Sequence, residues 1–148
     1  MDELISDLSH PGSGFYCLNV QETDLAGHAL DADAYIKHLN VADRGISEVL
    51  ALMQDEDILL VMADHGNDPT ATSSRHSREK VSLLVYKKGL VAVDLGTREP
   101  LADVGATVAD YFDTALLFGT SFLVSRPAAA LILHKIDVCK QNKWYNVD

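Results

Sequence analysis

Ile58-Leu59-Leu60-Val61-Met62-Ala63-Asp64-His65-Gly66-Asn67 carries the strongest structural signal in this chain. The apolar run 58–63 predicts a strand that is covered on both faces of a sheet. Asp64 and His65 follow at its carboxyl end, where open α/β sheets bind their ligands, and the pair suits a divalent cation. Gly66 and Asn67 are expected to ease the φ constraint where the chain turns away. A strand followed by a polar turn with an incidental histidine remains an open alternative.

Two further clusters of ligand-type residues lie beside predicted strands. Asp24 and His28 follow the apolar run 15–20, and their spacing places them on one face of a helical turn or brings them together in a strand-end loop. Gly27 between them allows the backbone to approach another group closely. His76 precedes the apolar run 81–86. Three such clusters at strand ends favour a metal site over coincidence.

Hydrophobic patterning predicts alternating strands and helices along most of the chain. We expect strands at residues 15–20, 58–63, 81–86 and 91–95, and helices at residues 30–54 and 105–113. Asp103 is the predicted N-cap of the second helix. The order strand, helix, strand indicates a right-handed parallel unit. The expected class is therefore α/β, with a largely parallel sheet flanked by helices.

The predicted helix at residues 30–54 carries an apolar stripe that should face the core. Its members recur at steps of four and three residues, namely Tyr35, Leu39, Ala42, Ile46, Val49 and Met53. This helix is expected to cover one face of the sheet.

Composition and charge narrow the classes of partner. The chain has 148 residues and a formal net charge of −10, with 23% charged and 47% hydrophobic residues, as in ordinary globular proteins. The negative charge argues against nucleic acid and anionic membranes as partners. No apolar run is long enough to span a bilayer and the acidic N-terminus does not read as a signal peptide, so a cytoplasmic location is expected.

The three clusters and their surroundings resemble the metal core of the alkaline phosphatase superfamily, and within it the phosphopentomutase family. The resemblance runs from about residue 15 to residue 123. The segments that carry it are Val20–His28, Asp64–Asn67, Arg75–Tyr86, Leu95–Arg98, Asp103–Ala109 and Gly119–Phe122. The third is similar to the family's His-Thr-Arg-Glu segment and the strand after it, and the last three resemble its closing segments. A partial alkaline-phosphatase-like core is therefore expected.

The resemblance implies a set of metal ligands and a reaction. By position, Asp24, His28 and His76 would hold one ion, and Asp64 and His65 a second. The family binds two divalent cations, commonly manganese in the mutases and zinc in the phosphatases, and this chain alone would hold one or two. The implied activity is intramolecular phosphate transfer on a phosphorylated sugar. Two interpretations of Asn67 and Asp68 stay open, as acceptors for a ligand histidine or as turn formers.

The resemblance also implies that parts of the catalytic apparatus have no counterpart here. The family uses a Ser or Thr nucleophile and a further metal-binding aspartate, both from an N-terminal half that nothing in this sequence matches. No catalytic residue is therefore assigned in this chain. A separate polypeptide that supplies the N-terminal half is expected if the chain is to act in catalysis. Self-association through the sheet edge where that half would pack is a further expectation.

The chain is divided into two regions at the end of the resemblance. Residues 1–123 are interpreted as the C-terminal portion of a metalloenzyme core domain, and residues 124–148 as an atypical extension. The extension would be a helix that covers the sheet edge, or an unrelated tail.

Three functions remain open from the sequence. The chain is part of a metal-dependent phosphomutase that is incomplete and inactive, or weakly phosphatase-like, by itself. Alternatively it is a truncated relative that serves as a non-catalytic metal-binding or interaction module. A generic α/β domain without metal is the third interpretation, which the coincidence of three Asp/His clusters disfavours.

Overall fold

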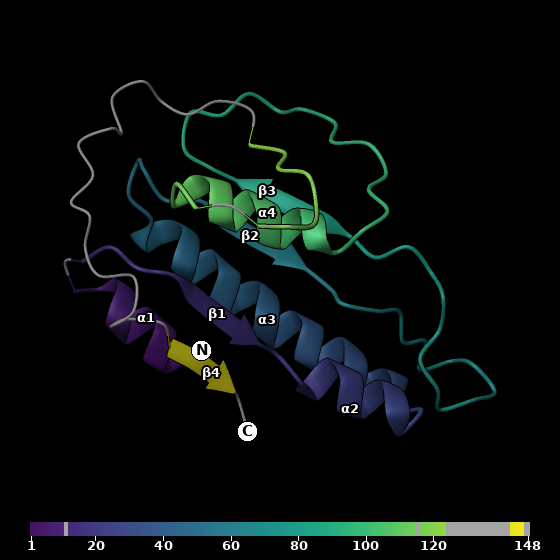
Figure 1. The fold of residues 1–148 in the computed structure, drawn as a ribbon. Coiled ribbons are helices and arrows are strands. Elements are labelled where there is room, and N and C mark those ends of the chain that lie inside the picture. Colours follow the sequence, from purple (N-terminus) through teal and green to yellow (C-terminus); the bar gives the residue numbers. More distant parts are fainter. Residues whose placement is uncertain (11, 115, 124–142, 147–148) are drawn as a thin grey trace. The chain divides into compact units, whose positions relative to one another are not determined.

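The structure, a computed structural model, describes residues 1–10, 12–114, 116–123 and 143–146. Its elements in chain order are α1 (Asp2–Leu8), β1 (Tyr16–Asn19), α2 (Glu22–His28), α3 (Ala32–Leu52), β2 (Leu59–Met62), β3 (Leu83–Tyr86), α4 (Ala102–Tyr111) and β4 (Lys143–Asn146) (Figure 1). They form two units. The first contains the elements up to Lys88 together with β4, and the second starts at Gly89 and contains α4.

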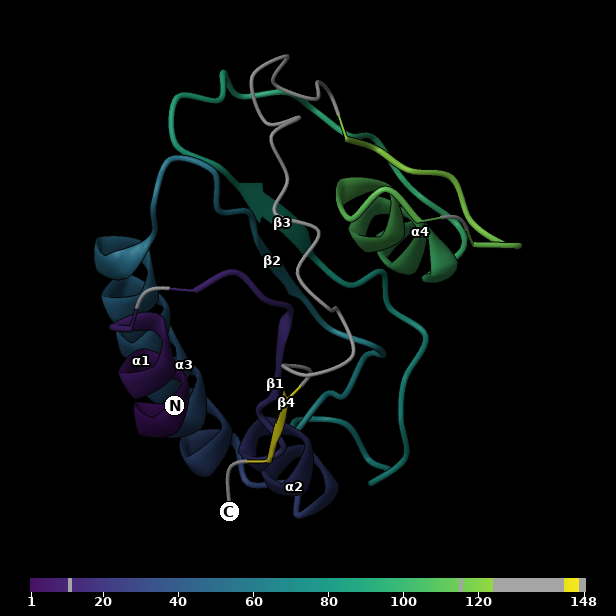
Figure 2. The same cartoon turned by 60° about the vertical axis from the view of Figure 1, so that its left-hand side comes forward.

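The core of the first unit lies where α1 packs along α3. Leu4 of α1 is buried with Val49 of α3 and Met53 at the end of that helix, and Tyr16 and Leu59 pack against them. The two helices lie side by side in both views (Figure 2). Helix α1 was not predicted from the sequence, and it supplies the apolar surface that the C-terminal half of α3 needs.

Helix α3 confirms the prediction for residues 30–54 and begins at a side-chain cap. The amide of Ala34 donates to Asp31 Oδ1 at 2.9 Å, which satisfies one of the free N–H groups of the first turn. The stripe is only partly confirmed, because Val49 and Met53 are buried but Leu39 is 48% exposed. The N-terminal half of α3 has α2 as its neighbour rather than α1.

The expectation of a largely parallel sheet is not met among the described residues. Strands β2 and β3 pair antiparallel, from Leu59 opposite Tyr86 to Met62 opposite Leu83, whereas β1 and β4 pair in parallel. Residues 63–82 contain no crossover helix, and without one the chain returns antiparallel. The described residues thus have mixed α/β structure in two separate strand pairs.

Several local expectations are also corrected. Strand β2 is not covered on both faces, since Met62 is 38% exposed and its neighbours are half-buried. Residues 91–95 form no strand, and Val91 is 79% exposed. Of the predicted extension, the described part is strand β4, which pairs with β1; residues 124–142 lie outside the described ones. In the described part of the chain, no helix combines the length and apolarity that a bilayer crossing requires.

The second unit is built around α4 and a buried aspartate. Asp103 does not cap the helix as predicted; Leu101 is the N-cap, without a side-chain bond. The Asp103 carboxylate instead accepts hydrogen bonds from Arg98 Nε at 2.6 Å and from the Thr120 amide at 2.7 Å. Thr107 accepts from the Phe122 amide at 3.1 Å. These bonds join the three closing segments of the family resemblance.

Candidate metal centre

Helix α2 presents two of the predicted ligands to the same side. Asp24 and His28 are four residues apart, and His28 Nε2 lies 3.3 Å from Asp24 Oδ2. Of the two arrangements that the sequence left open, the helical one is therefore observed. Both side chains remain more than a third exposed, so an ion can reach them from solvent.

The loop that follows β2 brings the other ligands to this helix. An isolated bridge joins Gly66 to Ser77, and the Ser77 amide donates to the Gly66 carbonyl at 2.9 Å. This bridge sets His76 beside His65, and their rings stack with centroids 3.6 Å apart. Gly66 does not use a positive φ, contrary to expectation. Its missing Cβ leaves room for the carboxylate of Glu79 instead.

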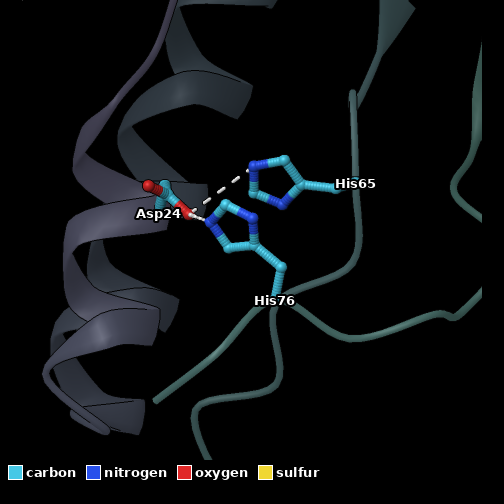
Figure 3. A group of neighbouring side chains, drawn as sticks. All are labelled: Asp24, His65 and His76. Carbon is cyan, nitrogen blue, oxygen red and sulfur yellow. Dashed lines mark ion pairs between the residues drawn. The ribbon is translucent and has the colours of Figure 1, made fainter.

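Asp24 is the point on which the imidazoles converge (Figure 3). Its Oδ1 lies 3.5 Å from His76 Nε2 and 3.9 Å from His65 Nε2, and one ligand atom from each residue falls within 4.8 Å of the others. His28 Nε2 is 3.1 Å from His76 Nε2. Asp64 is more peripheral, because its side chain is 81% exposed and its Oδ1 lies 3.6 Å from His65 Nε2.

Main-chain carbonyls orient two of the imidazoles. His28 Nδ1 lies 2.6 Å from the Ser74 carbonyl oxygen, and His65 Nδ1 lies 3.3 Å from that of Gly66. A carbonyl only accepts, so each Nδ1 carries the proton and donates it. The Nε2 lone pairs of both rings are then directed toward Asp24. Fixing the tautomer in this way is a recurrent feature of histidine metal ligands.

Asn67 holds the carboxylate of the cluster. Its Nδ2 donates to Asp24 Oδ1 at 2.8 Å and to the Asp24 carbonyl at 3.2 Å, so it is a donor to the aspartate rather than an acceptor for a histidine. Asp68 forms a turn, accepting from the amide and hydroxyl of Thr70 at 2.8 and 2.7 Å. The hydroxyl and then the amide of Thr70 hold the pKa of Asp68 below its usual range. Of the two interpretations that the sequence left open, turn formation is observed for Asp68, and neither describes the donor role of Asn67.

The donor set suits a divalent cation. Imidazole nitrogens and carboxylate oxygens are ligands for zinc and manganese, and neither needs a thiolate. Three Nε2 atoms around one carboxylate group, His28 at Oδ2 and the other two at Oδ1, form a poor hydrogen-bonding cluster without an ion, since Asp24 accepts only and at least two of the rings offer lone pairs. The chemistry of the residues thus fits a metal.

Comparison with known proteins gives the class to which the chain belongs. Residues 1–116 match the family described as the Metalloenzyme superfamily, and the chain is a member of that superfamily. Membership supports an alkaline-phosphatase-like fold and divalent metal cofactors.

Within this superfamily, the chain is similar to individual phosphopentomutases. The chain is 46% identical over 111 residues to the phosphopentomutase of Anaeromyxobacter sp. (strain K), an alignment that covers 74% of this chain and 29% of that protein. It is 40% identical over 126 residues to the phosphopentomutase of Clostridium novyi (strain NT), covering 83% of this chain and 32% of the relative. This chain thus spans less than a third of the length of these curated relatives.

Proposed function

We propose that this chain forms the divalent-metal centre of a phosphopentomutase-like phosphoryl-transfer protein. The convergence of His28, His65 and His76 on Asp24, in a member of the Metalloenzyme superfamily, carries the proposal. A bound divalent cation in such a site neutralises charge on a transferring phosphoryl group. The protein's own part is to hold the ligands in place, through the carbonyls of Ser74 and Gly66 and the fold of α2.

We propose manganese as the physiological cation, with zinc as the competing one, and two binding positions. Asp24, His28 and His76 would form one position, and Asp64 and His65 the other. The 3.1 Å approach of His28 to His76 supports the first, and the 3.6 Å approach of Asp64 to His65 supports the second. The proximity of His65 to Asp24 supports instead a single position that includes His65.

Titration calorimetry with Mn²⁺ and Zn²⁺ tests both arrangements. Wild-type protein with two positions gives two binding events, of which Asp64→Ala removes one and Asp24→Ala removes the tighter. With a single position, Asp64→Ala leaves one event of nearly unchanged affinity. Asp68→Ala is the matched control, because this carboxylate binds only within its own turn. Absence of any binding at micromolar metal would contradict the proposed function.

We propose that turnover on a phosphorylated pentose requires a nucleophile from a second polypeptide that carries the remainder of the family's core. Among the described residues, no Ser or Thr hydroxyl hydrogen-bonds to any of the five candidate ligands. The isolated chain would then show at most weak phosphatase activity. The test is a mutase assay with and without the product of an adjacent gene that encodes such a segment. Full mutase activity of the chain alone would contradict this part of the proposal.

A non-catalytic metal-binding or interaction module is the second candidate. It is favoured by apolar side chains that the first unit leaves exposed, with Leu25 and Leu84 each at 63% and Ile36 at 57%. Such side chains are suited to a protein partner or a second copy of the chain. Light scattering across a concentration series tests self-association, and a monomer at every concentration would count against it.

A further inference from the structure

Asn67 joins two segments of the first unit that are far apart in sequence. It lies in the loop after β2, and its Nδ2 donates to both the side-chain Oδ1 and the main-chain oxygen of Asp24 on α2. Two bonds from one nitrogen to one residue restrict the position of the helix and the rotation of its carboxylate together. In the described structure, the imidazoles of the cluster lie near the Asp24 carboxylate, at nitrogen–oxygen separations of 3.3, 3.5 and 3.9 Å, and Asn67 is the side chain that donates a hydrogen bond to it.

The carboxamide of Asn67 occupies space that only a glycine leaves open. A Cβ placed on Gly27 would overlap the Cγ, Oδ1 and Nδ2 atoms of Asn67. Gly27 itself is buried within α2, where glycine is otherwise an unfavourable choice. The glycine therefore serves the close approach of Asn67, which confirms the reason expected for it from the sequence.

We propose that Asn67, seated on Gly27, is a positioning residue that holds the Asp24 carboxylate ready for a cation. This inference rests on the proposed metal-binding function and deepens it. The amide proton of Asn67 takes one lone pair of Oδ1, which leaves the second lone pair for a cation. Outer-shell partners of this kind alter metal affinity by about 10- to 100-fold.

The contact between Asn67 and Gly27 can be tested without any metal. The carboxamide is able to swing aside, so Gly27→Ala should displace it from Asp24 rather than unfold α2. The test is a double-mutant cycle on the free energy of urea unfolding. Gly27→Ala should lower this free energy in the wild-type background, but not in the Asn67→Ala background, where the space beside residue 27 is already vacant. Gly105→Ala in α4 is the control, because its Cβ would meet only a Leu116 methyl group.

The positioning role requires a metal readout. Asn67→Asp keeps the shape but replaces the donor with a second carboxylate, and Asn67→Ala removes it. Both variants and Gly27→Ala should weaken Mn²⁺ binding about 10- to 100-fold in calorimetry. They should also change the visible spectrum of the Co²⁺-loaded protein, which reports ligand geometry. Asn40→Ala, which alters an exposed asparagine of α3, should change neither.

The outcomes separate this inference from the proposed function. Coupling between Gly27 and Asn67 together with weakened Mn²⁺ binding and an altered Co²⁺ spectrum supports it. Additive effects in the cycle, or wild-type Mn²⁺ affinity and spectrum in Asn67→Ala, overturn it while metal binding by the wild-type protein stands. If the cycle shows coupling but the wild-type protein binds no Mn²⁺, both the proposed function and the positioning role are overturned. Only a structural contact between Gly27 and Asn67 then remains.

Discussion

Asp24 and Asp103 are aspartates on short helices, and each lies at the centre of a polar cluster in its own unit of the chain. Asp103 has a side chain that is 6% exposed and is held by the Arg98 guanidinium and the Thr120 amide. Asp24 is 37% exposed and has one amide donor, Asn67, with imidazole nitrogens around the rest of the carboxylate. The first carboxylate has a donor on each oxygen and is buried, whereas the second is open to solvent and faces imidazole lone pairs.

The different surroundings of the two carboxylates suit them to different roles, one in stability and one in metal binding. A carboxylate that is buried and has a donor on each oxygen stabilises the fold, and its burial keeps a cation in solvent from reaching it. A carboxylate that shares its surroundings with Nε2 lone pairs gains its full complement of partners only when a cation is present. We therefore expect Asp103 to govern stability and Asp24 to govern metal binding.

The largest effects should come from replacing each aspartate, in a separate variant, by asparagine. Asp24→Asn should weaken Mn²⁺ binding by more than about a hundredfold, beyond the range of outer-shell partners, because it removes the negative charge between the imidazoles. Its thermal unfolding midpoint without metal should change little. Asp103→Asn should do the reverse, lowering the midpoint by several degrees with Mn²⁺ affinity unchanged. Equal loss of affinity in both variants would refute the distinction.

Adding and removing the metal should act on one unit alone. At an Mn²⁺ concentration of about 100 times Kd, binding should stabilise the folded protein by about 2.7 kcal/mol, and a chelator should reverse this. Amide hydrogen exchange should slow in α2 and in the loop from Asp64 to Ser77. Segments around Asp103 should exchange as before. Equal protection in both units would show that the metal acts on more than its ligands.

The pH dependence of stability should reveal the contribution of the buried Asp103 carboxylate. The Thr120 amide and then the Arg98 guanidinium hold the pKa of Asp103 below its usual range, against the opposing effect of burial. A depressed pKa in the folded state contributes stability that is present above the unfolded-state value of about 4 and is lost below it. Thermal unfolding between pH 6 and pH 3 should thus separate wild type from Asp103→Asn at pH 6, and the separation should narrow as the pH falls below about 4. A constant separation would contradict this assignment.

Ser74→Ala should have the smallest effect. The group that orients His28 is the Ser74 carbonyl, which every residue carries. Mn²⁺ affinity should therefore stay within about twofold of wild type, far from the range of a lost outer-shell partner. A loss of tenfold or more in calorimetry would mean that the serine hydroxyl takes part.

The sequence predicted which candidate ligands lie close together better than it predicted the sheet that carries them. Asp24, His28, Asp64, His65 and His76 were predicted as ligands from ligand-type side chains at strand ends and from the family resemblance. The structure brings His28, His65 and His76 close to Asp24 and leaves Asp64 more exposed beside His65, and their binding of an ion stays a prediction. The carbonyl of Ser74 has no such signal, since main-chain groups are common to all residues. The donor role of Asn67 was hidden for a different reason, because it depends on the vacant space at Gly27, 40 positions earlier.

The wrong predictions about the fold have a common cause, because each depended on contacts with residues outside the local sequence pattern. Residues 91–95 have the composition of a strand but pair with no strand among the described residues, and a strand without a neighbour leaves its backbone groups unpaired. Strand β3 was predicted correctly as an element, yet its direction against β2 depended on the connection rather than on the strand itself. Aspartate is a common N-cap residue, but the Asp103 side chain accepts hydrogen bonds from Arg98 and Thr120 instead.

The parallel pairing of β1 with β4 has a consequence for the order of events during synthesis. Tyr16 lies opposite Lys143 and Asn19 opposite Asn146, so the two strands are separated by nearly the whole chain. At roughly 5–20 residues per second, β1 leaves the ribosome on the order of ten seconds before its neighbour exists. During that interval the edge of β1 is available to other nascent chains. Chaperone demand should accordingly fall once residues 143–146 have emerged.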